Sequence, residues 1–314
     1  MSGNRFFLSH DGAIDELIAL LLLARRRDVD LIGISLTSAD CLTEQAMEAQ
    51  HRLLALAGRS DIPESLSSAR AVNPFPWKYR SDCVRFIQLD ALVQASRISP
   101  PYLDGERHLT RALESAGDKG LTILATGPLT QLQLVLEREP RLESHIRDVV
   151  WMGGAVDVPG NLEAETLPGV PVGKRAEWNA FWDPFAVDWI FGNTSVPLSV
   201  VPLDVSDQAR LSAEFLDGLE QAGRHSTAAR LARDAYQLVL DQPMYRLWDM
   251  TAACFALHPE FFAKPKSMRL AVEVWGPEQG ALAPNAAGRE ASVVQAFAPG
   301  GLERMHALII DSLV

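Results

Sequence analysis

The chain has 314 residues, of which 47% are hydrophobic and 22% are charged, and this composition is typical of a soluble globular protein with a sizeable core. Its formal net charge of −11 argues against nucleic acid or an anionic membrane as a partner, because both bind basic surfaces. A small neutral ligand is compatible with this charge. The three cysteines, Cys41, Cys83 and Cys254, are too widely spaced to suggest a disulfide framework or a zinc site.

The amino-terminal part of the sequence shows no sign of a membrane segment. Its apolar run, residues 17–24, has eight residues and is too short to span a bilayer. Residues 1–5 are not a cationic segment followed by an apolar one, so we expect no secretion signal. We therefore expect a cytoplasmic protein.

Strands and helices alternate along the chain. Short apolar and β-branched runs predict strands, and amphipathic patterns predict helices. Strands are expected at residues 6–8, 31–36, 121–125, 148–152 and 196–203, helices at 17–24, 43–57 and from about 129, and late strands at 268–275 and 291–297. This βα rhythm predicts an α/β fold in which helices cover a mostly parallel central sheet, in a Rossmann-like arrangement. Because no linker or repeat interrupts it, we expect a single domain spanning residues 1–314.

Two stretches do not fit this pattern. Residues 64–106 mix proline, tryptophan and arginine, and residues 155–178 are rich in glycine and proline. Long loops inside a compact α/β domain are often lids or binding loops. The alternative is a surface insertion, and the sequence favours neither interpretation over the other.

Residues 9–16 place three carboxylates in the turn between the first strand and the first helix, namely Asp11, Asp15 and Glu16. In open α/β sheets, ligands bind at the carboxyl ends of the strands. A hard cation relieves the repulsion between clustered carboxylates, so the turn predicts half of an oxygen-ligand metal site. The alternative is that Asp11 caps the helix while Asp15 and Glu16 complement its dipole.

Several strand tips share residues and spacing with a known family. Residues 9–16, Ser-His-Asp-Gly-Ala-Ile-Asp-Glu, follow the spacing of its opening signature, Asp-x-Asp-Pro-Gly-x-Asp-Asp. Further matches in the same order are Leu-Ala-Gly-Arg-x-Asp-Ile-Pro at 56–63, Thr-Gly-Pro-Leu-Thr at 126–130, Met-Gly-Gly at 152–154, Gly-Asn at 160–161, Ala-Glu-x-Asn at 176–179 and Asp-Pro at 183–184. From about residue 6 to residue 262, the chain resembles the inosine–uridine preferring nucleoside hydrolase family, which implies the nucleoside hydrolase fold.

The resemblance implies calcium-dependent cleavage of the N-glycosidic bond of a ribonucleoside. Asp11, Glu16 and Asp249 would supply carboxylate oxygens to Ca²⁺, and Thr126 would supply its backbone carbonyl. Asp11 would also accept the proton of the attacking water. The residues expected to bind the nucleoside are Asp15, which would hold ribose hydroxyls, together with Asp40, Met152, Asn161, Glu177, Asn179, Trp248 and Asp249.

Several of these residues also have a purely structural explanation. Glu177 and Asn179 could cap loops, and residues 126–128 could form only a turn. Asp249 begins an apolar run and could be the N-cap of a helix. Their joint occurrence at strand tips favours the functional interpretation.

The chain departs from the family pattern around the expected metal site. Ser9 stands where the first Asp of the signature is expected, and residues 12–13 are Gly-Ala in place of Pro-Gly. Glu16 replaces the last Asp and is one methylene longer, although glutamate also binds calcium in other proteins. Asp40 replaces an asparagine.

A second departure concerns the leaving base. The family's histidine-glycine loop is absent, and Trp248 replaces the histidine that precedes the final metal ligand. The base could then be handled by stacking on Trp248, by Tyr245 or Arg246, or not at all. The identity of the base is therefore open, and an unusual or modified nucleoside fits the sequence.

Three functions remain to be separated. The first is a calcium-dependent ribonucleoside hydrolase of nucleoside salvage, for which the resemblance implies a homodimer or homotetramer. The second is a non-catalytic relative that binds nucleoside or ribose and lost turnover through the changes at Ser9, Glu16 and Trp248. The third is a hydrolase of another N-ribosyl compound.

Overall fold

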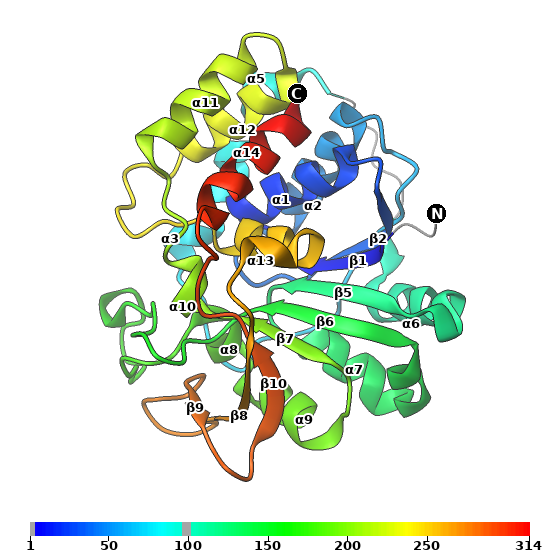
Figure 1. The fold of residues 1–314 in the computed structure, drawn as a ribbon, viewed down its shortest axis with the longest axis vertical. Helices are drawn as coiled ribbons and strands as arrows, with labels where there is room; N and C mark the ends of the chain where they lie inside the picture. Colours follow the sequence, from blue (N-terminus) through cyan, green and yellow to red (C-terminus); the bar gives the residue numbers. More distant parts are fainter. Residues whose placement is uncertain (1–3, 96–101) are drawn as a thin grey trace.

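One mixed sheet runs through the protein and contains ten strands among the residues that the computed structural model describes, 4–95 and 102–314 (Figure 1). Pairing is parallel from the β4 edge to β10, and β8 and β9 continue the sheet in antiparallel pairing. In their order across the sheet, the strands are β4 (Leu103–Asp104), β3 (Glu64–Leu66), β2 (Val29–Leu36), β1 (Asn4–His10), β5 (Leu121–Thr126), β6 (Ile146–Met152), β7 (Leu198–Val201), β10 (Arg289–Val293), β8 (Lys266–Val272) and β9 (Leu282–Pro284).

Helices pack on both faces of this sheet (Figure 1). Over the described residues they are α1 (Ile14–Arg25), α2 (Thr43–Leu56), α3 (Trp77–Arg80), α4 (Asp82–Phe86), α5 (Asp90–Val93), α6 (Gly105–Ala116), α7 (Thr130–Arg138), α8 (Trp178–Trp182), α9 (Pro184–Asn193), α10 (Leu203–Ser206), α11 (Ala213–Gly223), α12 (Thr227–Gln237), α13 (Trp248–Leu257) and α14 (Gly301–Leu313). Short 3-10 helices cover Gly117–Lys119, Pro140–His145, Ala164–Thr166 and Pro259–Phe261.

The sheet separates two hydrophobic cores, as the alternation of side chains along a strand requires. On one face Phe6 and Leu8 of β1 pack with α1, α13 and α14. On the other face Phe7 packs with α6, α7 and α9. The predicted α/β fold with a mostly parallel sheet covered by helices is therefore confirmed.

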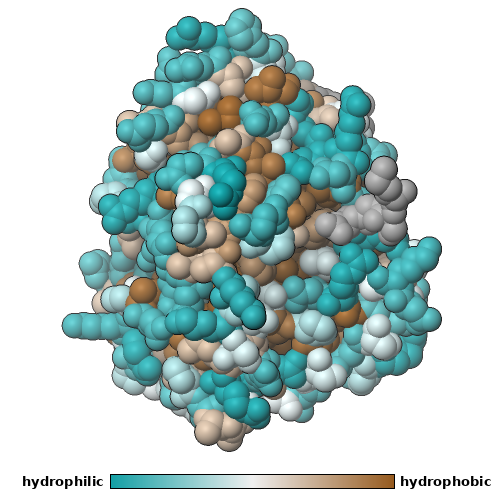
Figure 2. Space-filling view, viewed as in Figure 1, coloured by the Kyte–Doolittle hydropathy of each residue, from teal (hydrophilic) through white to brown (hydrophobic). Residues whose placement is uncertain are grey.

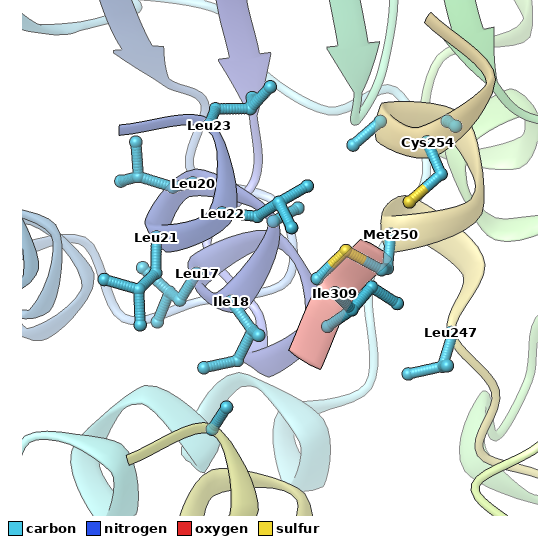
Figure 3. Close-up of a cluster of buried hydrophobic side chains, with 14 of the residues drawn as sticks. Leu17, Ile18, Leu20, Leu21, Leu22, Leu23, Leu247, Met250, Cys254 and Ile309 are labelled. Carbon is cyan, nitrogen blue, oxygen red and sulfur yellow. The ribbon is translucent and has the colours of Figure 1, made fainter. Parts of the chain in front are cut away.

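Helix α1 lies at the centre of the first core. Its residues 17–23 are fully buried because helices surround it. Figure 3 shows Met250 and Cys254 of α13 and Ile309 of α14 on one side of the α1 leucines. This packing fixes the start of α13 relative to the turn that precedes α1.

The structure corrects several predicted boundaries. The strand predicted at 196–203 is shorter, because Val201 ends β7 and α10 begins at Leu203. The two predicted late strands do pair, as β8 with β10, and the sequence missed the intervening β9. It also missed β3 and β4, which have three and two residues and are too short to show a period.

The two unassigned loop stretches lie against each other beside the sheet. The first stretch contacts α8, because the backbone N–H groups of Val72 and Asn73 both donate to the Trp182 carbonyl at 3.1 Å. The Tyr79 hydroxyl donates to Glu163 Oε2 at 2.5 Å. Residues 96–101 of the first stretch lie outside the described residues.

Hydrophilic side chains cover most of the face shown in Figure 2. A few large apolar side chains are exposed, such as those of Trp77 and Trp275. Scattered exposed apolar side chains are common on protein surfaces. Within residues 4–95 and 102–314, no helix combines the length and the apolar character needed to cross a membrane.

Candidate active site

A small cavity of about 70 Å³ lies at the carboxyl edge of the sheet, where β1 and β6 end. In Figure 1 this edge faces α3, α8 and α10. The cavity is lined by nine residues that the sequence predicted as site residues: Asp11, Glu16, Asp40, Met152, Asn161, Glu177, Asn179, Trp248 and Asp249. The fold thus brings together residues from six separate parts of the chain.

A larger cavity of about 1250 Å³ lies at the opposite end of the strands. Its wall includes Arg147 and Asp148 near the start of β6 and residues 194–197, which lead into β7. Open α/β sheets bind ligands at the carboxyl ends of their strands. None of the predicted site residues is among the described residues that line this larger cavity, so the smaller one is the candidate site.

Four carboxylates in the small cavity have a buried oxygen without a hydrogen-bond partner in the described part of the chain. Asp11 and Glu16 are each 3% exposed, and Asp249 is 6% exposed. The unpartnered atoms are Asp11 Oδ1, Glu16 Oε2, Asp40 Oδ1 and Asp249 Oδ1. A buried charged acceptor without a partner is costly, so this cluster requires either protons or a cation.

Helix capping does not explain these carboxylates. The residue before α1 is Ala13 and the residue before α13 is Leu247, and no side chain caps either helix through that position. Asp11 and Asp249 therefore do not serve as the N-caps that the sequence offered as an alternative.

Burial raises the pKa of Asp11, Glu16 and Asp249. Neighbouring negative charges raise the pKa of Glu16 and Asp249 further, with Asp11 contributing to both. A cation among these groups would favour their ionised forms instead.

The donor set suits a hard cation. Carboxylate oxygens dominate the described wall of the cavity, which contains neither histidine nor cysteine. Thr126 ends β5 in register with His10 and is fully buried, close to the turn that carries Asp11. Over the described residues, however, no three His, Cys, Asp or Glu side chains are already arranged to hold a metal ion. The carboxylates would have to close around an ion on binding.

Asp15 is not brought to the cavity with the other predicted residues. It is 1% exposed, and its Oδ1 accepts a hydrogen bond from the Tyr236 hydroxyl at 2.8 Å. Its Oδ2 accepts the backbone N–H groups of Asp249 and Met250 at 2.8 and 2.9 Å. Asp15 therefore holds the first turn of α13, and the ribose-binding role expected for it stays a prediction.

Glu177 and Asn179 line the cavity and also make hydrogen bonds that hold the surrounding backbone. Glu177 Oε2 accepts the N–H groups of Gly154 and Ala180, and its Oε1 accepts that of Asn179, so it caps α8. Asn179 Nδ2 donates to the Met152 carbonyl at 3.1 Å. Burial raises the pKa of Glu177 to about 7. These bonds hold the side chains rigidly at the cavity wall.

Ser9 points away from the cavity. Its hydroxyl donates to Gln131 Oε1 at 2.9 Å, and Gln131 Nε2 donates to Ser35 Oγ at 2.7 Å. The first position of the signature therefore belongs to a buried polar network between β1, β2 and α7.

Aromatic residues complete the wall. Trp248, which the sequence predicted, is joined by Tyr245, Phe75 and Trp178. Trp248 Nε1 donates to Asp207 Oδ1 at 2.9 Å. The sequence pointed to Tyr245 as an alternative, but it gave no indication of Phe75, Trp178 or the role of Asp207. Trp178 could have been noticed because it lies inside the matched motif at 176–179.

Comparison with known proteins identifies the family to which the chain belongs. A family model described as inosine-uridine preferring nucleoside hydrolase matches residues 6–299. The pyrimidine-specific ribonucleoside hydrolase RihA of Shewanella sp. (strain MR-7) is 28% identical over 213 residues, 67% of this chain and 62% of that protein. Uridine nucleosidase 1 of Arabidopsis thaliana is 26% identical over 229 residues, 71% of this chain and 63% of that protein.

A solved structure has the same fold over nearly the whole chain. The inosine-uridine preferring nucleoside hydrolase from Bacillus anthracis superposes with a TM-score of 0.87 at 28% identity, covering 98% of this chain and 99% of that one. The chain belongs to the inosine-uridine preferring nucleoside hydrolase family, a family of metal-dependent hydrolases. Its alignments with the two curated relatives span 62% and 63% of their lengths.

Proposed function

We propose that this protein hydrolyses the N-glycosidic bond of a ribonucleoside or a related N-riboside, giving free base and ribose, with Ca²⁺ as its cofactor. The observation that carries the proposal is the cavity in which Asp11, Glu16 and Asp249 each keep a buried oxygen without a partner among the described residues. Membership of the family supports the class of reaction. The names of the two curated relatives, a ribonucleoside hydrolase and a uridine nucleosidase, support a ribonucleoside as substrate.

The chain's own residues would divide the work between metal, water and sugar. Asp11, Glu16 and Asp249 would hold the ion with carboxylate oxygens, together with the backbone carbonyl of Thr126. A bound Ca²⁺ ion supplies a positive charge that positions and polarises the attacking water. Asp11 would accept the proton of that water, because a weakly polarised water needs a carboxylate base.

The sugar would lie against the polar part of the wall. Asn161, Glu177 and Asn179 line the cavity together with Asp40, and we assign them to the ribose hydroxyls. Cleavage builds positive charge on the ribose ring, which nearby carboxylates stabilise. Because Glu177 and Asn179 are fixed by backbone hydrogen bonds, little reorganisation would be needed when the charge develops.

The cavity is too small to hold a nucleoside as it stands. Its volume of about 70 Å³ is well below the roughly 300 Å³ at which ligand pockets usually begin. Entry of substrate therefore requires part of the wall to move outward. Phe75 belongs to the loop that rests on α8, and we assign this movement to that loop.

A non-catalytic relative that binds nucleoside or ribose is the second candidate. The observations that favour it are Ser9, which is bonded to Gln131, and Trp248, which lacks a titratable group. Such a protein would bind nucleoside without releasing ribose.

The deciding experiment is a screen of ribonucleosides for release of free ribose, with and without a calcium chelator. The hydrolase predicts ribose release that the chelator abolishes and that Ca²⁺ restores. Binding of nucleoside without any ribose release would favour the second candidate. Release that is unaffected by the chelator would contradict the role of the metal.

The assembly and location expected from the sequence also belong to the proposal. We expect a homodimer or homotetramer in the cytoplasm. Light scattering of the purified protein tests the assembly, and a monomer at all concentrations would contradict it.

A further inference from the structure

Two pairs of aromatic side chains form part of the wall of the small cavity, together with the carboxylates. The ring centroids of Tyr245 and Trp248 are 5.2 Å apart, and those of Phe75 and Trp178 are 4.7 Å apart. The indole of Trp248 is held in orientation by Asp207. Aromatic faces bind flat rings by stacking, and they attract cations through their negative quadrupole.

The described part of this wall has no imidazole that could protonate a departing base. Among its described residues there is no histidine, lysine, arginine or cysteine, and Tyr245 supplies the one hydroxyl. That hydroxyl oxygen accepts the backbone N–H of Asp15 at 3.1 Å. Glu177 is already committed as an acceptor of three backbone N–H groups. A neutral base that leaves as an anion would therefore receive no proton from an imidazolium.

The cavity is also acidic. Five carboxyl groups line it, those of Asp11, Glu16, Asp40, Glu177 and Asp249, and no basic side chain does so within the described residues. A divalent cation would neutralise two negative charges of the ionised carboxylates. The carboxylates that stay ionised attract a cationic ligand over a neutral one of the same shape.

A leaving group that is already a cation needs no general acid to protonate it. When the C1′–N bond of such a riboside breaks, the bonding electron pair neutralises the positive ring nitrogen, and the aglycone leaves as a neutral aromatic molecule. The oxygen of water bonds to C1′, and its proton passes to the carboxylate base and then to solvent. One riboside cation and one water thus give ribose, a neutral aglycone and one proton, without protonation of the leaving nitrogen.

We propose that this cavity selects N-ribosides whose leaving group is a flat aromatic cation, such as an N-ribosylpyridinium or an N7-alkylated purine riboside. This inference rests on the proposed N-riboside hydrolase function and specifies its substrate class. The aromatic pairs bind the ring, the carboxylates favour its charge, and the absence of an imidazole discriminates against neutral bases.

The first test compares guanosine with 7-methylguanosine at mildly acidic pH, where the methylated ring keeps its positive charge. We expect kcat/KM to be at least about 100-fold higher for 7-methylguanosine, because a neutral base lacks the help of a general acid. Trp248→His places an imidazole in the cavity, and it should raise guanosine cleavage at least about tenfold relative to 7-methylguanosine cleavage. The intrinsic reactivities of the two ribosides are the same for the parent and the variant. They therefore cancel when the guanosine to 7-methylguanosine ratio is compared between the two proteins.

The second test measures binding alone, by calorimetry with 1-methylnicotinamide and nicotinamide, which differ in charge but little in shape. We expect the cation to bind more tightly, and Trp248→Leu to raise its Kd about three- to thirtyfold. Trp275→Leu is the matched control, because Trp275 is 73% exposed and packs on Phe185. It should leave the Kd unchanged.

Specific results would overturn the inference. Equal kcat/KM for guanosine and 7-methylguanosine would do so, as would equal binding of the two nicotinamides. Tyr245→Phe should preserve the selectivity, and a selective loss of guanosine cleavage in this variant would identify Tyr245 as the acid and contradict the inference. Tighter binding of 1-methylnicotinamide without cleavage of any riboside would support the charge selection while refuting the hydrolase function, so the two failures are distinguishable.

Discussion

The carboxylate half and the aromatic half of the cavity differ in what determines them. The carboxylate half contains Asp11 from the turn after β1 and Glu16 from the first turn of α1, which both lie within the segment that follows the family signature, and Asp249 from α13. The aromatic half contains Trp248 where the resemblance implies a histidine, and Phe75 from a loop that matches no motif. Helix α13 joins the halves, because its first two residues are Trp248 and Asp249.

This contrast teaches that reaction class and substrate choice are separable in this protein. The carboxylate half would set the cleavage chemistry, which does not depend on the base. The aromatic half would set which aglycone can leave. Changes in one half should therefore affect all substrates alike, and changes in the other should reorder them.

The largest expected effect comes from the carboxylate half. Asp11→Asn keeps the size of the side chain but removes both a base and a negative charge from the cluster. We expect kcat to fall by at least about 10²-fold for every riboside, cationic or neutral. Steady-state kinetics on both kinds of substrate checks this, and near-normal turnover would refute the role assigned to Asp11.

The next prediction concerns the junction between the halves. Asp15→Ala leaves the Tyr236 hydroxyl and the N–H groups of Asp249 and Met250 without their acceptor. We expect a loss of about 2–4 kcal/mol in the free energy of unfolding, together with weaker metal and aglycone binding. Denaturant unfolding measures the first effect. A variant as stable as the parent would show that Asp15 does not hold α13.

A smaller and more selective effect is expected from the aromatic half. Asp207→Ala removes the acceptor of Trp248 Nε1, so the indole loses its fixed orientation. We expect KM to rise about three- to tenfold with little change in kcat, since a typical intramolecular hydrogen bond is worth about 1 kcal/mol net. If kcat falls as steeply as in Asp11→Asn, the two halves are not separable.

The smallest effect is expected from a substitution outside the cavity, at His108, which should change stability in acid but not catalysis. Burial lowers the pKa of His108 from about 6.5 to about 4, and its Nδ1 lies 2.9 Å from Ser65 Oγ. The unfolded chain binds this proton first, so stability is retained above about pH 6.5 and lost as the pH falls toward 4. His108→Gln should reduce this acid sensitivity by about 1–2 kcal/mol, after allowance for solvent screening.

Thermal or denaturant unfolding of both proteins between neutral and acidic pH measures the effect of His108. Parallel stability curves for the parent and His108→Gln would contradict the assignment. Ribose release at neutral pH should be the same in the two proteins, because His108 packs against Phe7 in the core and does not line the cavity.

The central sheet and the carboxylate tips could be predicted because both are encoded locally. The apolar run at 6–8 and the carboxylates that follow it make a strand and its polar tip visible in a few residues. The hydrogen bonds of Asp15 could not be predicted, since its partners Asp249 and Met250 are more than 230 positions away in the sequence. Glu16, its direct neighbour in the turn, lines the cavity instead.

Most of the aromatic wall could not be predicted from the sequence, for a related reason. Phe75 lies in a stretch without periodicity, and its contact with Trp178 depends on how two irregular loops meet. The partnership of Trp248 with Asp207 likewise joins α13 to the loop after α10. Long-range contacts between irregular segments leave no local pattern to recognise.

Calorimetric titration of Ca²⁺ into chelator-treated protein tests the central claim most directly, because it measures metal binding without relying on turnover. We predict one site per chain, which Glu16→Gln and Asp249→Asn weaken at least about tenfold through loss of a charged ligand. Trp275→Leu should bind the ion as the parent does. No binding by the parent, or unchanged binding in both carboxylate variants, would contradict the assignment of this cavity as the metal site.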